Sequence, residues 1–322
     1  MRSRMSSSRS LAPAIHTRRA RAISCISAAP VALAAGRSTR SRLDTSPNST
    51  RSTRSRSQSG RSLKTEWPTS DIGSPYASGH DEPHKRERTV PVDLARWQPV
   101  RQCGVVRFVL VHSPLVGPGT WRWVAEDLVE AGHEVAVPDL RAAAATGDPA
   151  AVVSAAVAVV GDAPVVIAGH SGAGSLLPSI AAGAEAQLVF VDAGVPPCSG
   201  PVGANAEFLE QLRSLSIGGV LPKWSTWWGE GAMEGLVPDE ARRRQVVDEL
   251  PQIPLAFYES SFTAPAGWCQ MPASFVLLSE AYRADVDTAR SRGWPVVERL
   301  GNHLDIVNRP SAVTSAIVEV TV

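Results

Sequence analysis

The stretch Pro164–Ala168 (PVVIA) runs directly into Gly169–Gly174 (GHSGAG), and this junction decides the fold. The apolar run is rich in β-branched residues, which is typical of a strand buried on both faces of a parallel sheet. The glycine-rich turn predicts an abrupt change of direction into a helix, which we expect from about Ser175 to Ala182. Ser171 then lies in the turn, clear of the sheet.

Strand and helix patterns alternate on both sides of this junction. Apolar runs predict further strands, and apolar residues at helical spacing predict helices between them. The expected strands are Arg107–Val111, Glu134–Val137, Leu188–Val191, Phe275–Leu278 and Pro295–Arg299, and the expected helices include Trp121–Ala131 and Ala150–Val160. The alternation implies right-handed crossovers, so we predict an α/β fold with a mostly parallel sheet flanked by helices.

The segment between Asp192 and Pro272 interrupts this alternation. It contains helical patterns at Ala206–Leu215 and Asp239–Leu250, and four of the nine tryptophans. We predict that residues 195–271 form a helical cap inserted over one end of the sheet.

The first 88 residues differ in character from the rest of the chain. Residues 1–65 carry 14 Lys and Arg against a single acid, Asp44, although the whole chain has a net charge of only +1. Such Arg/Ser-rich sequence cannot bury enough apolar surface to offset the entropy of ordering. We therefore predict a disordered extension over 1–88 and one domain over 89–322. No aromatic residues are interleaved with the basic ones, so no nucleic-acid partner is expected.

The spacing of the cysteines and the length of the apolar runs indicate the cellular compartment and whether the chain binds a metal or spans a membrane. The four cysteines, Cys25, Cys103, Cys198 and Cys269, lack metal-ligand spacing, so we predict reduced thiols in a cytoplasmic protein without a metal. The alternative is export, because Arg18-Arg19 precede a short apolar run. No apolar run reaches the roughly 18 residues of a membrane span. Nothing in the sequence indicates an oligomeric state.

Small residues surround Ser171 in the pattern G-x-S-x-A, with Gly169 before it and Ala173 after it. Bulky neighbours would collide with the adjacent strand and helix, so the pattern is typical of a strained turn that exposes a nucleophilic serine. The N–H of Gly172 opens the helix and faces a developing oxyanion. An incidental serine in a glycine-rich turn is the alternative. A phosphate-binding loop is not expected, since Gly169–Gly174 lacks both the Lys-Ser/Thr and the G-x-G-x-x-G patterns.

Four parts of the chain, taken together, resemble the α/β-hydrolase superfamily, in particular its small esterase and hydroxynitrile-lyase-like branch. They are HSP followed by GHEVAVPDLR, then VVIAGHSGAG, LVFVDA and GNHLDIVNRP, and the resemblance covers about Val105–Val322. It implies Ser171 as the nucleophile and His303, in the last loop, as the general base, in the chain order Ser, acid, His. It implies no cofactor and no metal.

Three residues compete for the acid, whose task is to fix the imidazole tautomer. The family places the acid just past the strand that precedes the histidine loop, and the matching position is near Tyr282, which cannot serve. Glu280 is the first choice and Asp285 the second, although Asp285 also suits the N-cap of a helix ending near Arg292. Asp192, at the end of LVFVDA, is the third choice, with the support of a strand end as its alternative role.

The loop that should supply a second oxyanion donor departs from the family's His-Gly-X pattern. This chain has His112-Ser113-Pro114-Leu115, and proline has no N–H. We assign the donor to Leu115.

The predicted function is a serine hydrolase that cleaves a small-molecule ester or similar acyl compound through an acyl-enzyme on Ser171. Trp224, Trp227 and Trp228 are expected either to wall an apolar pocket for that substrate or to pack the cap. One alternative is a cofactor-free lyase on the same fold, with His303 as acid and base and no acyl-enzyme. The other is a non-catalytic protein that binds a small ligand, which Pro114 and the missing acid favour.

Overall fold

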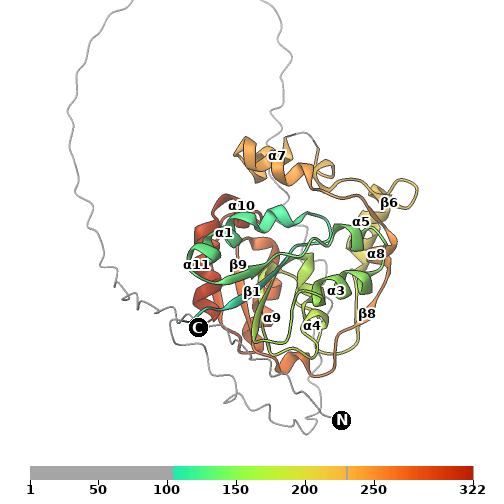
Figure 1. Cartoon of the computed structure of the whole chain (residues 1–322). Coiled ribbons are helices and arrows are strands. Elements are labelled where there is room, and N and C mark those ends of the chain that lie inside the picture. Colours follow the sequence, from blue (N-terminus) through green and yellow to red (C-terminus); the bar gives the residue numbers. More distant parts are fainter. Residues whose placement is uncertain (1–103, 230, 322) are drawn as a thin grey trace, which may run out of the picture. The chain divides into compact units, whose positions relative to one another are not determined.

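The computed structural model describes residues 104–229 and 231–321. The predicted extension, the export alternative, Cys25 and Cys103 lie outside these residues. The described part of the chain contains a six-stranded sheet in the order β10-β9-β4-β3-β1-β2, with helices around it (Figure 1). None of the described helices is long and apolar enough to cross a membrane.

The predicted mostly parallel sheet is confirmed, because all five pairings in it are parallel. Its strands are β1 (Arg107–Val111), β2 (Glu134–Ala136), β3 (Val165–Ser171), β4 (Ala186–Ala193), β9 (Ala273–Leu277) and β10 (Val296–Glu298). β3 continues three residues past its apolar run, so that Ser171 is its last residue. The carboxyl ends of β1, β3, β4 and β9 therefore meet at one edge of the sheet, where ligands bind in open α/β sheets.

Two hydrophobic cores cover the two faces of the sheet, because successive strand residues point to opposite sides. One core takes residues such as Ile167 and Phe190, and the other takes their neighbours Val166 and Val189. The helices that pack on the first face are α2 (Arg141–Ala144), α3 (Pro149–Val157), η2 (Gly172–Leu176), α4 (Leu177–Ile180) and α9 (Arg283–Ser291). Those on the second are η1 (Pro118–Trp121), α1 (Arg122–Glu130), α10 (Asp305–Asn308) and α11 (Pro310–Thr321).

The chain between β4 and β9 forms short helices and two small two-stranded sheets. The helices are α5 (Ala206–Leu215), η3 (Trp224–Thr226), α6 (Ala232–Leu236), α7 (Glu240–Asp248), α8 (Ala256–Glu259) and η4 (Trp268–Gln270). The two-residue strands pair antiparallel, β5 (Pro201–Val202) with β8 (Phe262–Thr263) and β6 (Val220–Leu221) with β7 (Ile253–Pro254). Figure 1 shows α7 above α10 and α1, and β6 at the right of the view. We call residues 195–271 the cap segment.

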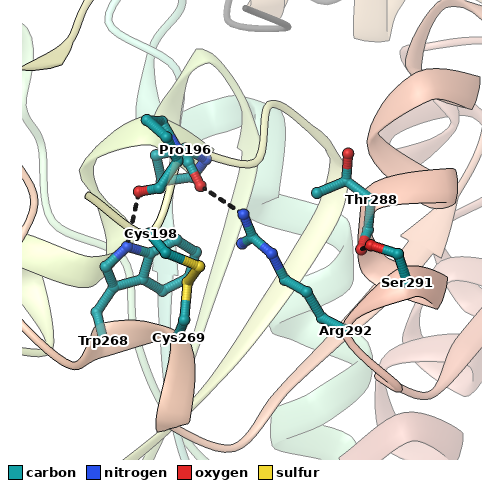
Figure 2. The surroundings of a disulfide bond; sticks show 8 residues. Pro196, Cys198, Trp268, Cys269, Thr288, Ser291 and Arg292 are labelled. Atoms are coloured by element: carbon teal, nitrogen blue, oxygen red, sulfur yellow. Dashed lines mark hydrogen bonds between the residues drawn. A yellow bond between two sulfur atoms is a disulfide. The ribbon is translucent and has the colours of Figure 1, made fainter. Parts of the chain in front are cut away.

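A disulfide joins the two ends of the cap segment. Cys198 follows β4, Cys269 lies in η4 just before β9, and their Cα atoms are 5.5 Å apart. Around the bond, the Trp268 indole N–H donates to the carbonyl oxygen of Pro197, and the Arg292 guanidinium donates to that of Pro196 (Figure 2). The prediction of four reduced thiols is therefore wrong for this pair. Their sequence separation of 71 conceals the closeness that adjacent strands β4 and β9 impose.

We expect the disulfide to stabilise the fold substantially. A bond that closes a loop of this length removes conformational entropy from the unfolded chain, worth about 4 kcal/mol. The double variant Cys198→Ser, Cys269→Ser should therefore unfold at a lower urea concentration than the wild type. A reducing agent should destabilise the wild type by a similar amount and leave the double variant unchanged. Equal unfolding free energies for the wild type and the double variant, both measured without a reducing agent, would contradict this expectation.

Candidate active site

Ser171 has a strained backbone, with φ 58° and ψ −127°. Among the described residues, only Ser171 and Asp192 combine a side chain with positive φ. Each such conformation costs on the order of 1–3 kcal/mol and persists mainly where the surrounding structure enforces it, often at functional sites. The turn is enforced by close packing, because a Cβ on Gly174 would lie 2.3 Å from the carbonyl oxygen of Gly194. A Cβ on Gly169 would lie 2.7 Å from a methyl group of Leu177.

His303 reaches Ser171 from the loop between β10 and α10. Its Nε2 lies 3.0 Å from Ser171 Oγ, across 132 residues of sequence. The ring stacks on His170 at a centroid distance of 4.4 Å, and His170 Nε2 lies 2.9 Å from the carbonyl oxygen of His303. His170 thus holds both the ring and the backbone of His303 in position.

Asp192 supports the other side of the imidazole. Its Oδ2 lies 2.7 Å from His303 Nδ1, and its side chain is fully buried. Three further donors converge on the same carboxylate: the N–H groups of Leu278 and Ser279, at 2.9 and 2.8 Å, and the Ser279 hydroxyl, at 2.6 Å. This network orients the carboxylate rigidly. With Nδ1–H donating to Asp192, His303 Nε2 is free of hydrogen and can accept the Ser171 proton.

Glu280 and Asp285 were predicted to contact His303, and the structure places both in other contacts. Glu280 is exposed, and its carboxylate bonds the guanidinium of Arg283, which lowers the pKa of Glu280. Asp285 is buried, and its Oδ1 accepts the Val195 N–H at 2.7 Å. It also lies inside α9 and does not cap it, because the N-cap is Tyr282. The carboxylate that contacts His303 is that of Asp192, the third choice from the sequence.

The signal that could have found Asp192 is its position at the end of a fully buried strand. β4 is hydrogen-bonded directly to β3, so the last residues of LVFVDA lie beside Ser171. A carboxylate at that point lies within hydrogen-bond distance of His303.

β1 and β4 are the two neighbours of β3 in the sheet, so the loop after β1 lies on the side of β3 opposite to Asp192. The N–H of Val116 donates to the carbonyl oxygen of Ser113 at 3.1 Å, so it is used within the turn. The N–H of Leu115 makes only a long contact, 3.4 Å, with Ser113 Oγ. Because Pro114 has no N–H, Leu115 remains the proposed partner of Gly172 in an oxyanion hole.

His112 anchors this loop as a buried, neutral imidazole. Its Nδ1 donates to the carbonyl oxygen of Ser113 at 2.8 Å, and its Nε2 accepts the Leu140 N–H at 3.0 Å. Burial lowers the pKa of His112 from 6.5 to about 4. Burial, and next the charge of His303, lowers the pKa of His170 well below 6.5.

We expect the free energy of unfolding to decrease as the pH falls from 6.5 toward 4. In this range the unfolded chain binds a proton at each of these two imidazoles and the folded chain does not, so acid favours unfolding. His112 alone contributes about 3 kcal/mol over the range. Urea titrations between pH 7 and pH 4 would measure the slope. His112→Gln should make it shallower while lowering stability at neutral pH, and an unchanged slope would contradict the assignment.

The cap segment contacts both loops that carry the site. The Glu249 carboxylate accepts the N–H of Gly119, in η1, at 2.6 Å. On the other side, the side-chain amides of Asn302 and Asn308 donate to the carbonyl oxygen of Leu236, at 3.2 and 2.7 Å. Asn302 directly precedes His303, so the cap segment and the histidine loop are held together.

Of the three tryptophans predicted near the substrate, Trp224 and Trp227 pack on the hydrophobic core. Trp224 is buried, and Trp227 is half-buried with its indole N–H donating to the carbonyl oxygen of Pro222. Trp227 and Trp228 contact each other with ring centroids 6.4 Å apart. A role for them in substrate binding remains a prediction. In the part of the chain that the structure describes, no cluster of His, Cys, Asp and Glu could hold a metal ion.

Comparison with known proteins gives matches among solved structures. No family model matches the chain, and a search of curated proteins finds no match. An extracellular α/β-hydrolase from a Paenibacillus species matches with 18% identity and a TM-score of 0.55, covering 67% of this chain and 98% of that one. Polyneuridine aldehyde esterase matches with 15% identity and a TM-score of 0.55, covering 68% of this chain and 100% of that one. A variant of tomato methylketone synthase I matches with 13% identity and a TM-score of 0.50, covering 67% and 97%.

Proposed function

We propose that this chain, which has the α/β-hydrolase fold, is a serine hydrolase that cleaves an ester or a similar acyl compound. The likeness to solved structures concerns the fold, so the argument for the chemistry comes from the site. Its support is one continuous chain of contacts, from Ser171 Oγ to His303 Nε2 and from His303 Nδ1 to Asp192 Oδ2. Nucleophile, base and orienting acid in that order are what nucleophilic acyl transfer requires.

In the proposed first step, Ser171 Oγ attacks the acyl carbon while its proton passes to His303 Nε2. The carbonyl oxygen becomes an oxyanion, and the N–H groups of Gly172 and Leu115 are the proposed donors to it. Asp192 stabilises the imidazolium that forms and keeps its Nδ1–H in place. The intermediate then collapses, the bond to the leaving group breaks, and His303 returns the proton to the leaving group.

In the second step, a water molecule takes the place of the leaving group. His303 accepts a proton from the water as its oxygen attacks the acyl carbon, and the second tetrahedral intermediate collapses. The proton then returns to Ser171 Oγ, and the free acid departs. The step consumes one water and restores the enzyme, so no cofactor is needed for its balance.

Covalent labelling tests the proposal. A fluorophosphonate should label the purified full chain at one site, and mass spectrometry of the peptides should locate the label on Ser171. The variant Ser171→Ala should take up no label, and Ser179→Ala, on the helix after the turn, should label as the wild type does. Labelling elsewhere, or none, would refute the nucleophile. Labelling of Ser171 in a protein that hydrolyses no member of an ester panel would favour the lyase alternative.

A further inference from the structure

Tyr282 brings a hydroxyl group to the nucleophile. It is the last residue of η5 (Glu280–Tyr282), just after β9, and its side chain is buried. Its hydroxyl oxygen lies 3.2 Å from Ser171 Oγ, and its ring stacks on the ring of His303 at a centroid distance of 5.3 Å and an angle of 15°. The reaction proposed above does not use the Tyr282 hydroxyl, although this hydroxyl contacts the attacking atom, Ser171 Oγ.

The direction of the hydrogen bond follows from the proton count. Ser171 has one hydroxyl proton, and in the resting site this proton points to His303 Nε2. Oγ then offers only lone pairs to a second partner, so Tyr282 must donate its O–H to Ser171 Oγ. Tyr282 is therefore a donor aimed at the reacting centre.

The order of strands tells on which side of the nucleophile this donor lies. Tyr282 comes from the end of β9, whereas the loop with Leu115 comes from the end of β1. In the sheet, β9 and β1 lie on opposite sides of β3, which carries Ser171. The donor from Tyr282 is thus on the far side from the proposed oxyanion loop. It shares its side with His303, whose Nε2 delivers the proton to the leaving group.

We propose that Tyr282 is a catalytic residue that donates a hydrogen bond to the oxygen atom of the leaving group and then to the water that replaces it. This proposal rests on the serine hydrolase function proposed above. As Oγ forms its bond to the acyl carbon, the Tyr282 hydroxyl turns from Oγ to the departing oxygen, on which charge develops. His303 supplies the proton that the leaving group carries away, and Tyr282 keeps its own proton throughout.

This arrangement makes the site selective for oxygen esters over thioesters. Sulfur is a weak hydrogen-bond acceptor, so a thiolate leaving group gains little from a hydroxyl donor. Thiolates also leave readily without such help, because thiols are far more acidic than alcohols. The benefit from Tyr282 should therefore be specific to the leaving-group atom.

The test uses Tyr282→Phe with two substrates that differ in one atom. They are the ethyl ester and the S-ethyl thioester of whichever fatty acid the wild type hydrolyses fastest. Loss of one hydrogen bond in the transition state should lower kcat/KM for the ethyl ester about 10-fold. The loss for the thioester should stay below about 2-fold. Tyr258→Phe, which alters another buried tyrosine, in the cap segment, should leave the ratio of the two substrates unchanged.

Three outcomes distinguish this proposal from its rivals. Phenylalanine keeps the ring against His303, so the fluorophosphonate should still label Ser171 in Tyr282→Phe within about 3-fold of the wild-type rate. Equal losses on both substrates, with slow labelling, would mean that Tyr282 only positions His303 and would overturn the proposal. Unchanged kcat/KM on both would overturn it as well. A wild type that neither labels nor hydrolyses esters would instead refute the hydrolase function itself, and this proposal with it.

Discussion

Ser171→Ala should lower kcat about 10⁶-fold on any ester that the wild type turns over. The variant lacks the proposed nucleophile, the hydroxyl oxygen that lies 3.0 Å from His303 Nε2, so no acyl-enzyme can form. Alanine also keeps a Cβ at φ 58°, so the strain of the turn stays and the fold should be retained. Steady-state turnover and the burst of the first acyl transfer would both measure the loss.

Ser179→Ala is the matched control for this experiment, since it removes a hydroxyl from the helix that follows the same turn. We expect its kcat to stay within about 2-fold of the wild type, as most substitutions away from reacting groups do. Turnover by Ser171→Ala at more than a hundredth of the wild-type rate would exclude Ser171 as the nucleophile. A circular dichroism spectrum identical to that of the wild type would show that the loss is chemical.

Asp192→Asn should lower kcat about 10⁴-fold through the tautomer of His303. The asparagine oxygen can still accept hydrogen bonds from the N–H groups of Leu278 and Ser279, so we expect the local fold to be retained. The amide nitrogen would then face His303 Nδ1 and donate to it. That contact forces the proton onto Nε2, which can no longer accept the hydrogen of Ser171.

Glu280→Gln is the matched control, because Glu280 was the first choice for the acid and is now assigned to an exposed ion pair with Arg283. Its turnover should stay within about 2-fold of the wild type. Full activity in Asp192→Asn together with a large loss in Glu280→Gln would reverse the assignment. The pair of variants thus decides between the contact that the structure contains and the position that the family resemblance implied.

Local pattern predicted the sheet and the turn well, for a physical reason. Four of the six strands, β1, β3, β4 and β9, bury nearly all their side chains, so their apolar runs could be recognised without knowledge of their partners. The turn at Ser171 could be predicted from its small residues, and the structure leaves no room for a side chain at Gly169 or Gly174. The bounds shifted by a few residues, most clearly in β3, whose last three residues are not apolar but continue the hydrogen-bonded ladder.

The carboxylate that contacts His303 was not the first choice from the sequence, because this contact depends on which strands are neighbours. Asp192 is the next-to-last residue of β4 and Glu280 comes shortly after β9, so both lie near the carboxyl edge of the sheet. Which of the two carboxylates meets the imidazole depends on the position of His303, which lies more than 100 residues after Asp192 in the sequence. Asp192 also has a positive φ of 44°, which an apolar periodicity does not reveal.

The sequence by itself determined the α/β architecture, the strained turn and the identity of the serine and histidine that the fold could bring together. Apolar periodicity and the sizes of neighbouring side chains are local properties, and they decide local structure. Tertiary structure alone decided the partner of the imidazole, the pairing of Cys198 with Cys269 and the approach of Tyr282 to Ser171. Each of these contacts joins residues from 71 to 111 positions apart. Such contacts depend on strand order and loop path, which are set when the whole core packs and not by any single segment of the chain.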